Sequence, residues 1–89
     1  MKKLLVLGGT HYQIPVIDYA RSQGHYVITC DYLPSNPGHQ RANEYQNIST
    51  TGREAILSFA EARSIDGILA YASDPAAPTA AYVADRLGL

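Results

Sequence analysis

The glycine turn "GGTHYQ" carries the first group of side chains suited to chemistry. In it Gly8 and Gly9 precede Thr10, His11 and Gln13. Glycines let a ligand approach the backbone closely, and the amide groups at the start of a following helix favour an anion such as a phosphate or carboxylate. The three polar side chains add donors. The turn therefore predicts a substrate- or anion-binding corner, and the alternative is a tight strand-to-helix turn.

A second group of candidates consists of Asp31, Ser73 and Asp74. Asp31 lies at the end of an apolar stretch, about 20 residues after the glycine turn, where an acidic residue binds a ribose hydroxyl in dinucleotide sites. Acidic residues also end strands because they favour turns. Ser73 and Asp74 either cap a helix or form a small polar site. Thr10 and Gln13 stand where a dinucleotide fingerprint has its second and third glycines.

Other catalytic and metal-binding patterns are missing from the sequence. The three histidines, His11, His25 and His39, do not have metal-ligand spacing, and Cys30 is the single cysteine. Neither a nucleophile elbow, nor a phosphate-binding loop with its lysine, nor a zinc-protease motif occurs. A lone cysteine within an apolar stretch is typical of a buried hydrophobic side chain. The sequence thus contains no complete active site and predicts no metal site.

Four apolar strands and three helices are expected to position these residues. The apolar run Leu4–Leu7 has the composition of a strand buried on both faces of a parallel sheet. The other predicted strands are His25–Cys30, which ends at Asp31, then Glu44–Ser49 and Asp66–Tyr71.

Helical periodicity and capping residues place the helices between these strands. A first helix contains Ile14, Pro15, Ile17 and Ala20 and ends at Gly24. The buried stripe Ala55, Ile56, Phe59 and Ala60 predicts a second helix, for which Thr50 or Thr51 is the expected cap with Glu54 as capping-box partner. A third helix is predicted over Ala76–Leu87, with "SDP" supplying its cap and first-turn proline and Gly88 ending it.

Strands that alternate with helices indicate an α/β fold with a parallel sheet. We predict one Rossmann-like domain over residues 1–89, with about four strands in the order 3-2-1-4 and helices on both faces. Ligands of such sheets bind beyond the carboxyl ends of the strands. The loops Gly8–Gln13, Asp31–Pro37 and Tyr71–Pro75 should therefore meet. Because the fourth strand would be left as a bare edge, we expect either a fragment of a longer enzyme or a chain that pairs with another.

Composition restricts the partners. The 89 residues are 46% hydrophobic and 17% charged, with seven basic and eight acidic side chains. This balance favours neither nucleic acid nor a membrane surface, and small molecules or proteins are the expected partners. The apolar run after Lys2 and Lys3 is too short for a signal peptide, which needs about 7–15 apolar residues. A single cysteine agrees with a cytoplasmic location.

The stretches "KKLLVLGGTHYQIPVIDYA", "ANEYQ" and "SDPAAPTAAYVADRLGL" together resemble the N-terminal domain of ATP-grasp ligases. The similarity is greatest to the carbamoyl-phosphate-synthase-like proteins and to their relatives among the purine-pathway carboxylases. Those carboxylases carry a third glycine where Thr10 stands here.

The resemblance implies an enzyme that uses ATP and Mg²⁺ to activate a small-molecule carboxylate as an acyl phosphate, which an amine or another nucleophile then attacks. Later ATP-grasp domains of the same chain would bind ATP and Mg²⁺, and the fragment itself would bind neither and be inactive. This domain would contribute its glycine turn to the substrate side and help to form a homodimer. Two alternatives remain open: a free-standing dinucleotide-binding module, and a receiver-like interaction domain, although receivers carry acidic residues where glycines stand here.

Overall fold

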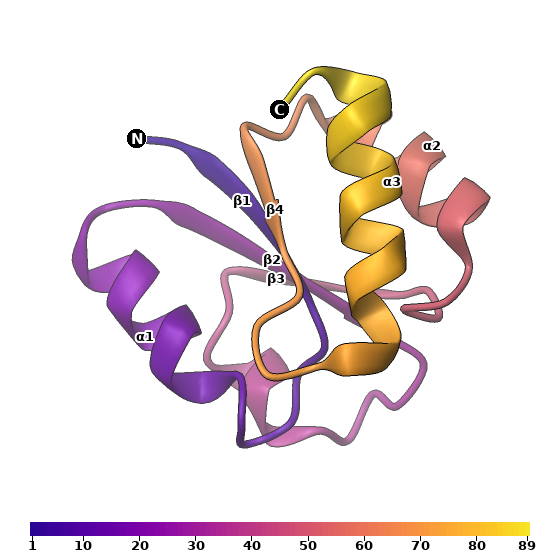
Figure 1. Cartoon of the computed structure of the whole chain (residues 1–89). Helices are drawn as coiled ribbons and strands as arrows, with labels where there is room; N and C mark the ends of the chain where they lie inside the picture. Colours follow the sequence, from indigo (N-terminus) through magenta and orange to yellow (C-terminus); the bar gives the residue numbers. More distant parts are fainter.

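The computed structural model describes all 89 residues as a layered α/β domain (Figure 1). In chain order the elements are β1 (Lys3–Leu7), α1 (Ile14–Ser22), β2 (Tyr26–Asp31), the 3-10 helix η1 (Pro37–Gln40), β3 (Glu44–Asn47), α2 (Arg53–Arg63), β4 (Gly67–Leu69), the 3-10 helix η2 (Asp74–Ala76) and α3 (Ala77–Leu87). None of the helices has the length and apolar character needed to cross a membrane.

The four strands form one parallel sheet in the order β3-β2-β1-β4, as the sequence predicted. Leu7 lies opposite Cys30 of β2, and Val6 lies opposite Leu69 of β4. Because β1 lies between β2 and β4, the loop that follows it is next to the loops that follow both neighbours. The topology therefore brings the glycine turn, the loop after β2 and the loop after β4 to one edge of the sheet.

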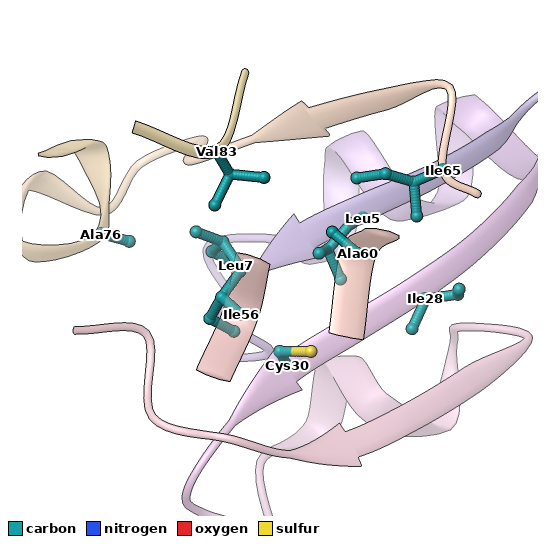
Figure 2. Packing of buried hydrophobic residues seen from close by; sticks show 9 residues of the cluster. All are labelled: Leu5, Leu7, Ile28, Cys30, Ile56, Ala60, Ile65, Ala76 and Val83. Atoms are coloured by element: carbon teal, nitrogen blue, oxygen red, sulfur yellow. The ribbon is translucent and has the colours of Figure 1, made fainter. Parts of the chain in front are cut away.

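Helices cover both faces of the sheet, which confirms the predicted layers. Alternate residues of β1 point to opposite faces, as in any strand. Leu5 and Leu7 belong to a cluster of nine buried residues between the sheet and helices α2 and α3 (Figure 2). Val6 packs with Ile17 of α1 on the other face. The continuous apolar run of β1 is thus explained by burial on both sides.

The ends of α1 and α3 follow their predicted signals. Pro15 lies in the first turn of α1, where its missing N–H removes no helical hydrogen bond. Gly24, just after α1, has φ +83°, and Gly88, which caps α3, has φ +71°. Both are left-handed conformations that glycine adopts without steric cost. These two glycines are therefore helix terminators, as expected.

The predicted cap of α2 is wrong. Gly52, not Thr50 or Thr51, is the N-cap residue, and no side chain caps the helix. Thr51 Oγ1 is instead 3.0 Å from Ser49 Oγ, within the preceding turn. The carboxylate of Glu54 accepts a hydrogen bond from the Tyr82 hydroxyl of α3 and so links the two helices. Instead of forming a capping box, Thr51 pairs with Ser49 and Glu54 contacts α3.

The predicted start of the third helix is also corrected. The sequence "SDP" opens the 3-10 helix η2, with Ser73 at its N-cap position, and α3 begins only at Ala77. No side chain makes a capping hydrogen bond at either helix start. The hydroxyl of Ser73 and the carboxylate of Asp74 are therefore left without a structural partner.

Two strands are shorter than predicted. β3 ends at Asn47 rather than Ser49, because the Ile48 amide bonds the Gln46 carbonyl and turns the chain away. β4 covers Gly67–Leu69 rather than Asp66–Tyr71. Its ladder with β1 ends at the pair Val6–Leu69, one residue before β1 itself ends at Leu7, and Gly8 then bends the chain with a φ of +108°.

Candidate functional site

A cleft of about 560 Å³ lies where the three loops meet at the carboxyl ends of the strands. Its lining includes six of the eight residues that the sequence singled out: Gly8, Thr10, Gln13, Asp31, Ser73 and Asp74. Gly9 and His11 do not line it. Gly9 is buried beneath the cleft, and the exposed His11 ring lies 4.2 Å from the ring of Tyr12, centroid to centroid.

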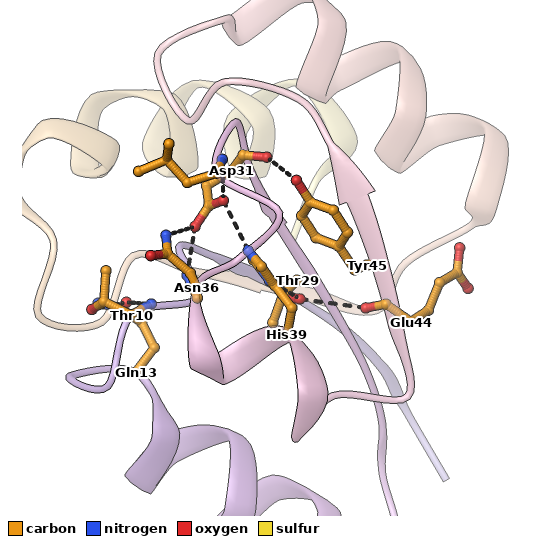
Figure 3. A network of polar contacts seen from close by, with 10 residues as sticks. Thr10, Gln13, Thr29, Asp31, Asn36, His39, Glu44 and Tyr45 are labelled. Carbon is orange, nitrogen blue, oxygen red and sulfur yellow. Dashed lines mark hydrogen bonds and ion pairs between the residues drawn. The ribbon is translucent and has the colours of Figure 1, made fainter.

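The carboxylate of Asp31 is fully engaged by the protein (Figure 3). Its Oδ2 accepts hydrogen bonds from the Gly9 amide at 2.9 Å and from Asn36 Nδ2 at 2.8 Å. Its Oδ1 accepts from the Leu33 amide and lies 2.8 Å from His39 Nε2. Four donors therefore converge on two oxygens. Asp31 acts as the junction between the glycine turn and the loop after β2, and its binding of a ribose hydroxyl stays a prediction.

The environment of Asp31 favours its charged form. Burial raises the pKa of this carboxyl, but hydrogen bonds from Asn36, the Leu33 amide and His39 outweigh burial and hold the pKa below its usual value. The side chain is only 7% exposed. A negative charge therefore lies beneath the cleft, compensated by hydrogen-bond donors rather than by lysine or arginine.

A buried relay runs from Asp31 through His39 to Thr29. His39 Nδ1 lies 2.8 Å from Thr29 Oγ1, and Nε2 faces the Asp31 carboxylate. A proton on Nε2 satisfies the contact with Asp31, since Nε2–H then donates to the carboxylate, and Nδ1 shares the second hydrogen bond with the Thr29 hydroxyl. This order of groups is that of a catalytic triad. Thr29 is completely buried, however, so its hydroxyl cannot reach a substrate, and the relay is structural.

The two glycines of the turn have separate roles. Gly8 has φ +108° and makes the bend that a residue with a Cβ would resist. Gly9 lies against the loop after β2: a Cβ on Gly9 would be 2.2 Å from the His39 ring, and one on Gly38 would be 2.5 Å from the Gly9 carbonyl oxygen. The Gly38 amide donates to that same oxygen. The pair therefore allows two loops to meet backbone to backbone.

Gln13 connects the glycine turn to the loop after β4. Its Oε1 accepts from both the amide and the hydroxyl of Thr10, at 2.8 and 2.7 Å. Its Nε2 donates to the Tyr71 carbonyl at 2.9 Å. The side chain is 2% exposed and packs over Gly8, where the third glycine of a dinucleotide fingerprint would leave space. Gln13 thus organises the cleft wall more than it offers a donor to a ligand.

Sequence reasoning missed several residues of the cleft. Tyr12, Tyr32 and Leu33 line it and are strongly exposed. The rest of its wall is formed by Asn36, Thr50, Ala72 and Pro75. The tyrosines could have been found, because each lies within or beside a loop that the topology brings to this edge. His39 could not, because its contacts with Asp31 and Thr29 depend on how the loop after β2 folds back.

The cleft residues do not fit ATP with Mg²⁺. No group of three or more His, Cys, Asp or Glu side chains could hold a metal ion. None of the thirteen lining residues is Lys, Arg or His, which would be needed to balance a triphosphate. What the arrangement offers is a polar cleft with free acceptors, walled by two tyrosines.

No protein-family model matches the chain, and no curated protein matches its sequence. Solved structures do match its fold. A phosphoribosylglycinamide synthetase from Anaerococcus prevotii has a TM-score of 0.89 at 21% identity, over 99% of this chain and 23% of its own. An N5-carboxyaminoimidazole synthetase from Staphylococcus aureus, solved with ADP, has a TM-score of 0.79 at 15% identity, over 96% of this chain and 22% of its own.

A third match is a precorrin-6A reductase (CobK), with a TM-score of 0.73 at 20% identity, over all of this chain and 37% of the reductase. The two synthetases are ATP-grasp ligases and the matched regions are N-terminal, so the predicted resemblance is confirmed as a resemblance of fold. The chain spans about a quarter of the length of those ligases. At these identities the likeness shows the fold alone.

Proposed function

We propose that the chain forms the substrate-binding N-terminal domain of an ATP-grasp ligase that joins a carboxylate to an amine, of the carbamoyl-phosphate-synthase-like kind. The observation that supports the proposal is the match in fold of almost the whole chain to the N-terminal quarter of ATP-grasp ligases, together with the cleft at the carboxyl ends of its own strands. The cleft then forms one wall of the substrate site, and the enzyme is cytoplasmic.

ATP and Mg²⁺ belong to other domains of the enzyme in this proposal. ATP would supply the phosphoryl group that activates the carboxylate for attack by the amine. This chain's residues would bind and orient a substrate: Thr10, Ser73 and Asp74 face the cleft, while Gln13 and Asp31 hold its walls. The partners are a small-molecule carboxylate substrate, the remaining ATP-grasp domains and a second copy of the enzyme.

The test compares the 89-residue chain with a longer one. The isolated chain should show no ATP hydrolysis. The reading frame should continue beyond Leu89 for roughly 200 or more residues with glycine-rich and acidic ATP-site motifs, as a multidomain enzyme requires. The longer protein should hydrolyse ATP in the presence of its substrates. ATP turnover by residues 1–89 alone, or a reading frame without such motifs, would overturn the proposal.

A dinucleotide-binding module is the second candidate, favoured by the match to a reductase and by Asp31 at the end of β2. Two contacts weigh against it. The Asp31 carboxylate already accepts from four donors, and Gln13 occupies the place of the third glycine. Calorimetric titration with NAD and NADP separates the candidates, because saturable binding in the micromolar range would favour the module and contradict the ligase domain.

A further inference from the structure

The glycine turn has almost no backbone donors left for an anion. Of the amides from Gly8 to Ile14, only that of His11 has no partner within the chain. His11 does not line the cleft, and Pro15 removes a further N–H from the first turn of α1. A phosphate held at a helix start needs several free amides directed at it. In this turn nearly all of the amides already donate hydrogen bonds within the chain.

Charge also opposes an anion in the cleft. Two of the lining side chains, Asp31 and Asp74, are acidic, and no lining side chain is basic. Like charges a few ångströms apart repel, and the burial of Asp31 weakens the screening by water. A phosphate or carboxylate group would therefore meet negative charge without a compensating cation.

The free groups of the cleft are acceptors and aromatic faces. Neither the Ser73 hydroxyl nor the Asp74 carboxylate makes a capping hydrogen bond at η2 or α3, and both residues line the cleft. Tyr12 and Tyr32 line the same cleft and are 63% and 64% exposed. A cleft lined by a carboxylate and by exposed aromatic rings suits an ammonium group, which bonds carboxylate oxygens and is attracted to ring faces.

We propose that the cleft binds its small-molecule ligand through a primary ammonium group, held by Asp74 and Ser73 and flanked by Tyr12 and Tyr32. This assignment rests on the proposed function: of the two substrates that the ligase joins, the amine is the one that contacts this domain. The anion-binding role predicted for the glycine turn is replaced by a structural one.

Three probes separate the chemistries: D-glucosamine, which carries an ammonium, D-glucose, which is its neutral counterpart of the same size, and inorganic phosphate, which is a smaller anion. The ¹⁵N-labelled chain is titrated with each while the amide signals of Gly8, Thr10 and Ser73 are followed by NMR. Glucosamine should shift these signals in the millimolar range and more weakly as salt is added. Glucose should bind several-fold more weakly, and phosphate should leave the cleft signals unchanged.

Matched variants locate the charge that matters. Asp74→Asn should weaken glucosamine binding about two- to fivefold, the range of an exposed ion pair, and leave glucose binding unchanged. Asp85→Asn removes the same charge from an exposed site near the far end of α3 and should have no effect. Spectra of both variants show whether they stay folded. Equal binding of glucosamine to wild type and Asp74→Asn would overturn the proposal.

The outcomes also separate this inference from the proposed function. Phosphate that saturates the Gly8, Thr10 and His11 signals would overturn the ammonium assignment and leave a ligase domain with an anion site. Micromolar binding of NAD or NADP at the cleft would contradict the ligase domain itself. Binding of glucosamine and glucose with equal affinity would show that hydroxyl groups, not the ammonium, are recognised, and would overturn the assignment as well.

Discussion

Gly9→Ala tests whether the second glycine serves the fold or a ligand. A methyl group on Gly9 would lie 2.2 Å from Cε1 and 2.4 Å from Nδ1 of His39. Real Cβ atoms do not approach so closely, so the imidazole must move. Its two hydrogen bonds, to Asp31 and to Thr29, would then be lost from a buried site. If Gly9 served only to admit a ligand, the substitution would leave stability unchanged.

The expected loss is large for a chain of this size. Overpacking a core position costs about 1–3 kcal/mol, and leaving a buried polar group unpaired costs about 1–3 kcal/mol. Together these give about 2–6 kcal/mol. The stability typical of an 89-residue domain is roughly 4–13 kcal/mol. Gly9→Ala should therefore lower the urea midpoint strongly, measured by circular dichroism at 222 nm.

A double-mutant cycle identifies the clash as the cause. In a His39→Ala background the space beside Gly9 is open, so the added cost of Gly9→Ala should fall below about 1 kcal/mol, with the difference appearing as coupling. Gly52→Ala is the control, because the nearest atom outside its local backbone is 3.4 Å from the new methyl. Equal losses from Gly9→Ala with and without His39 would refute the reasoning, as would a stable Gly9→Ala single variant.

Three further results are expected. Because the pKa of Asp31 is lowered from its usual 3.8, its network stabilises the fold above that value, and the contribution is lost as the pH falls below it. The difference in unfolding free energy between wild type and Asp31→Asn should therefore shrink between about pH 6 and about pH 3. A difference that stays constant over this range would contradict the reasoning. Burial raises the pKa of Cys30 to about 12, so iodoacetamide near pH 8 should alkylate its thiol only after urea has unfolded the chain, as measured by mass spectrometry. Rapid alkylation of the folded chain would refute the burial of Cys30. Gln13→Ala should lower the free energy of unfolding in urea by about 1–3 kcal/mol, because the amide and hydroxyl of Thr10 lose their acceptor. The control Gln23→Ala, at an exposed position, should change it by less than about 0.5 kcal/mol. Similar effects of the two substitutions would count against the connecting role of Gln13.

Much of the fold was readable from the sequence because its signals are local. The apolar run Leu4–Leu7 indicated a strand buried on both faces, and the helix-ending glycines Gly24 and Gly88 stand where they were expected. The capping predictions failed because a hydroxyl near a helix start has competing partners. Thr51 pairs with Ser49, and that choice depends on the turn geometry.

For the candidate site, the sequence predicted where the residues lie but not what they contact. Parallel order alone placed Gly8, Asp31 and Ser73 at one edge of the sheet, because the carboxyl ends of neighbouring strands lie together. Their chemical roles did not follow from residue type. Asp31 has the residue type and position of an acidic group that binds a ribose hydroxyl, yet its carboxylate oxygens accept hydrogen bonds from within the protein.

The sequence by itself determined the sheet, its strand order and the edge at which the cleft lies, because these follow from the periodicity of apolar residues and the length of the connections. Only the tertiary structure decided which polar groups remain free. The Gly9 amide donates to Asp31, and Gln13 bonds to both Thr10 and the Tyr71 carbonyl, so loops far apart in the chain use these groups on one another. Ser73 and Asp74 make no capping hydrogen bond. Hydrogen bonds are saturable and act at short range, so their allocation is fixed only when the loops meet.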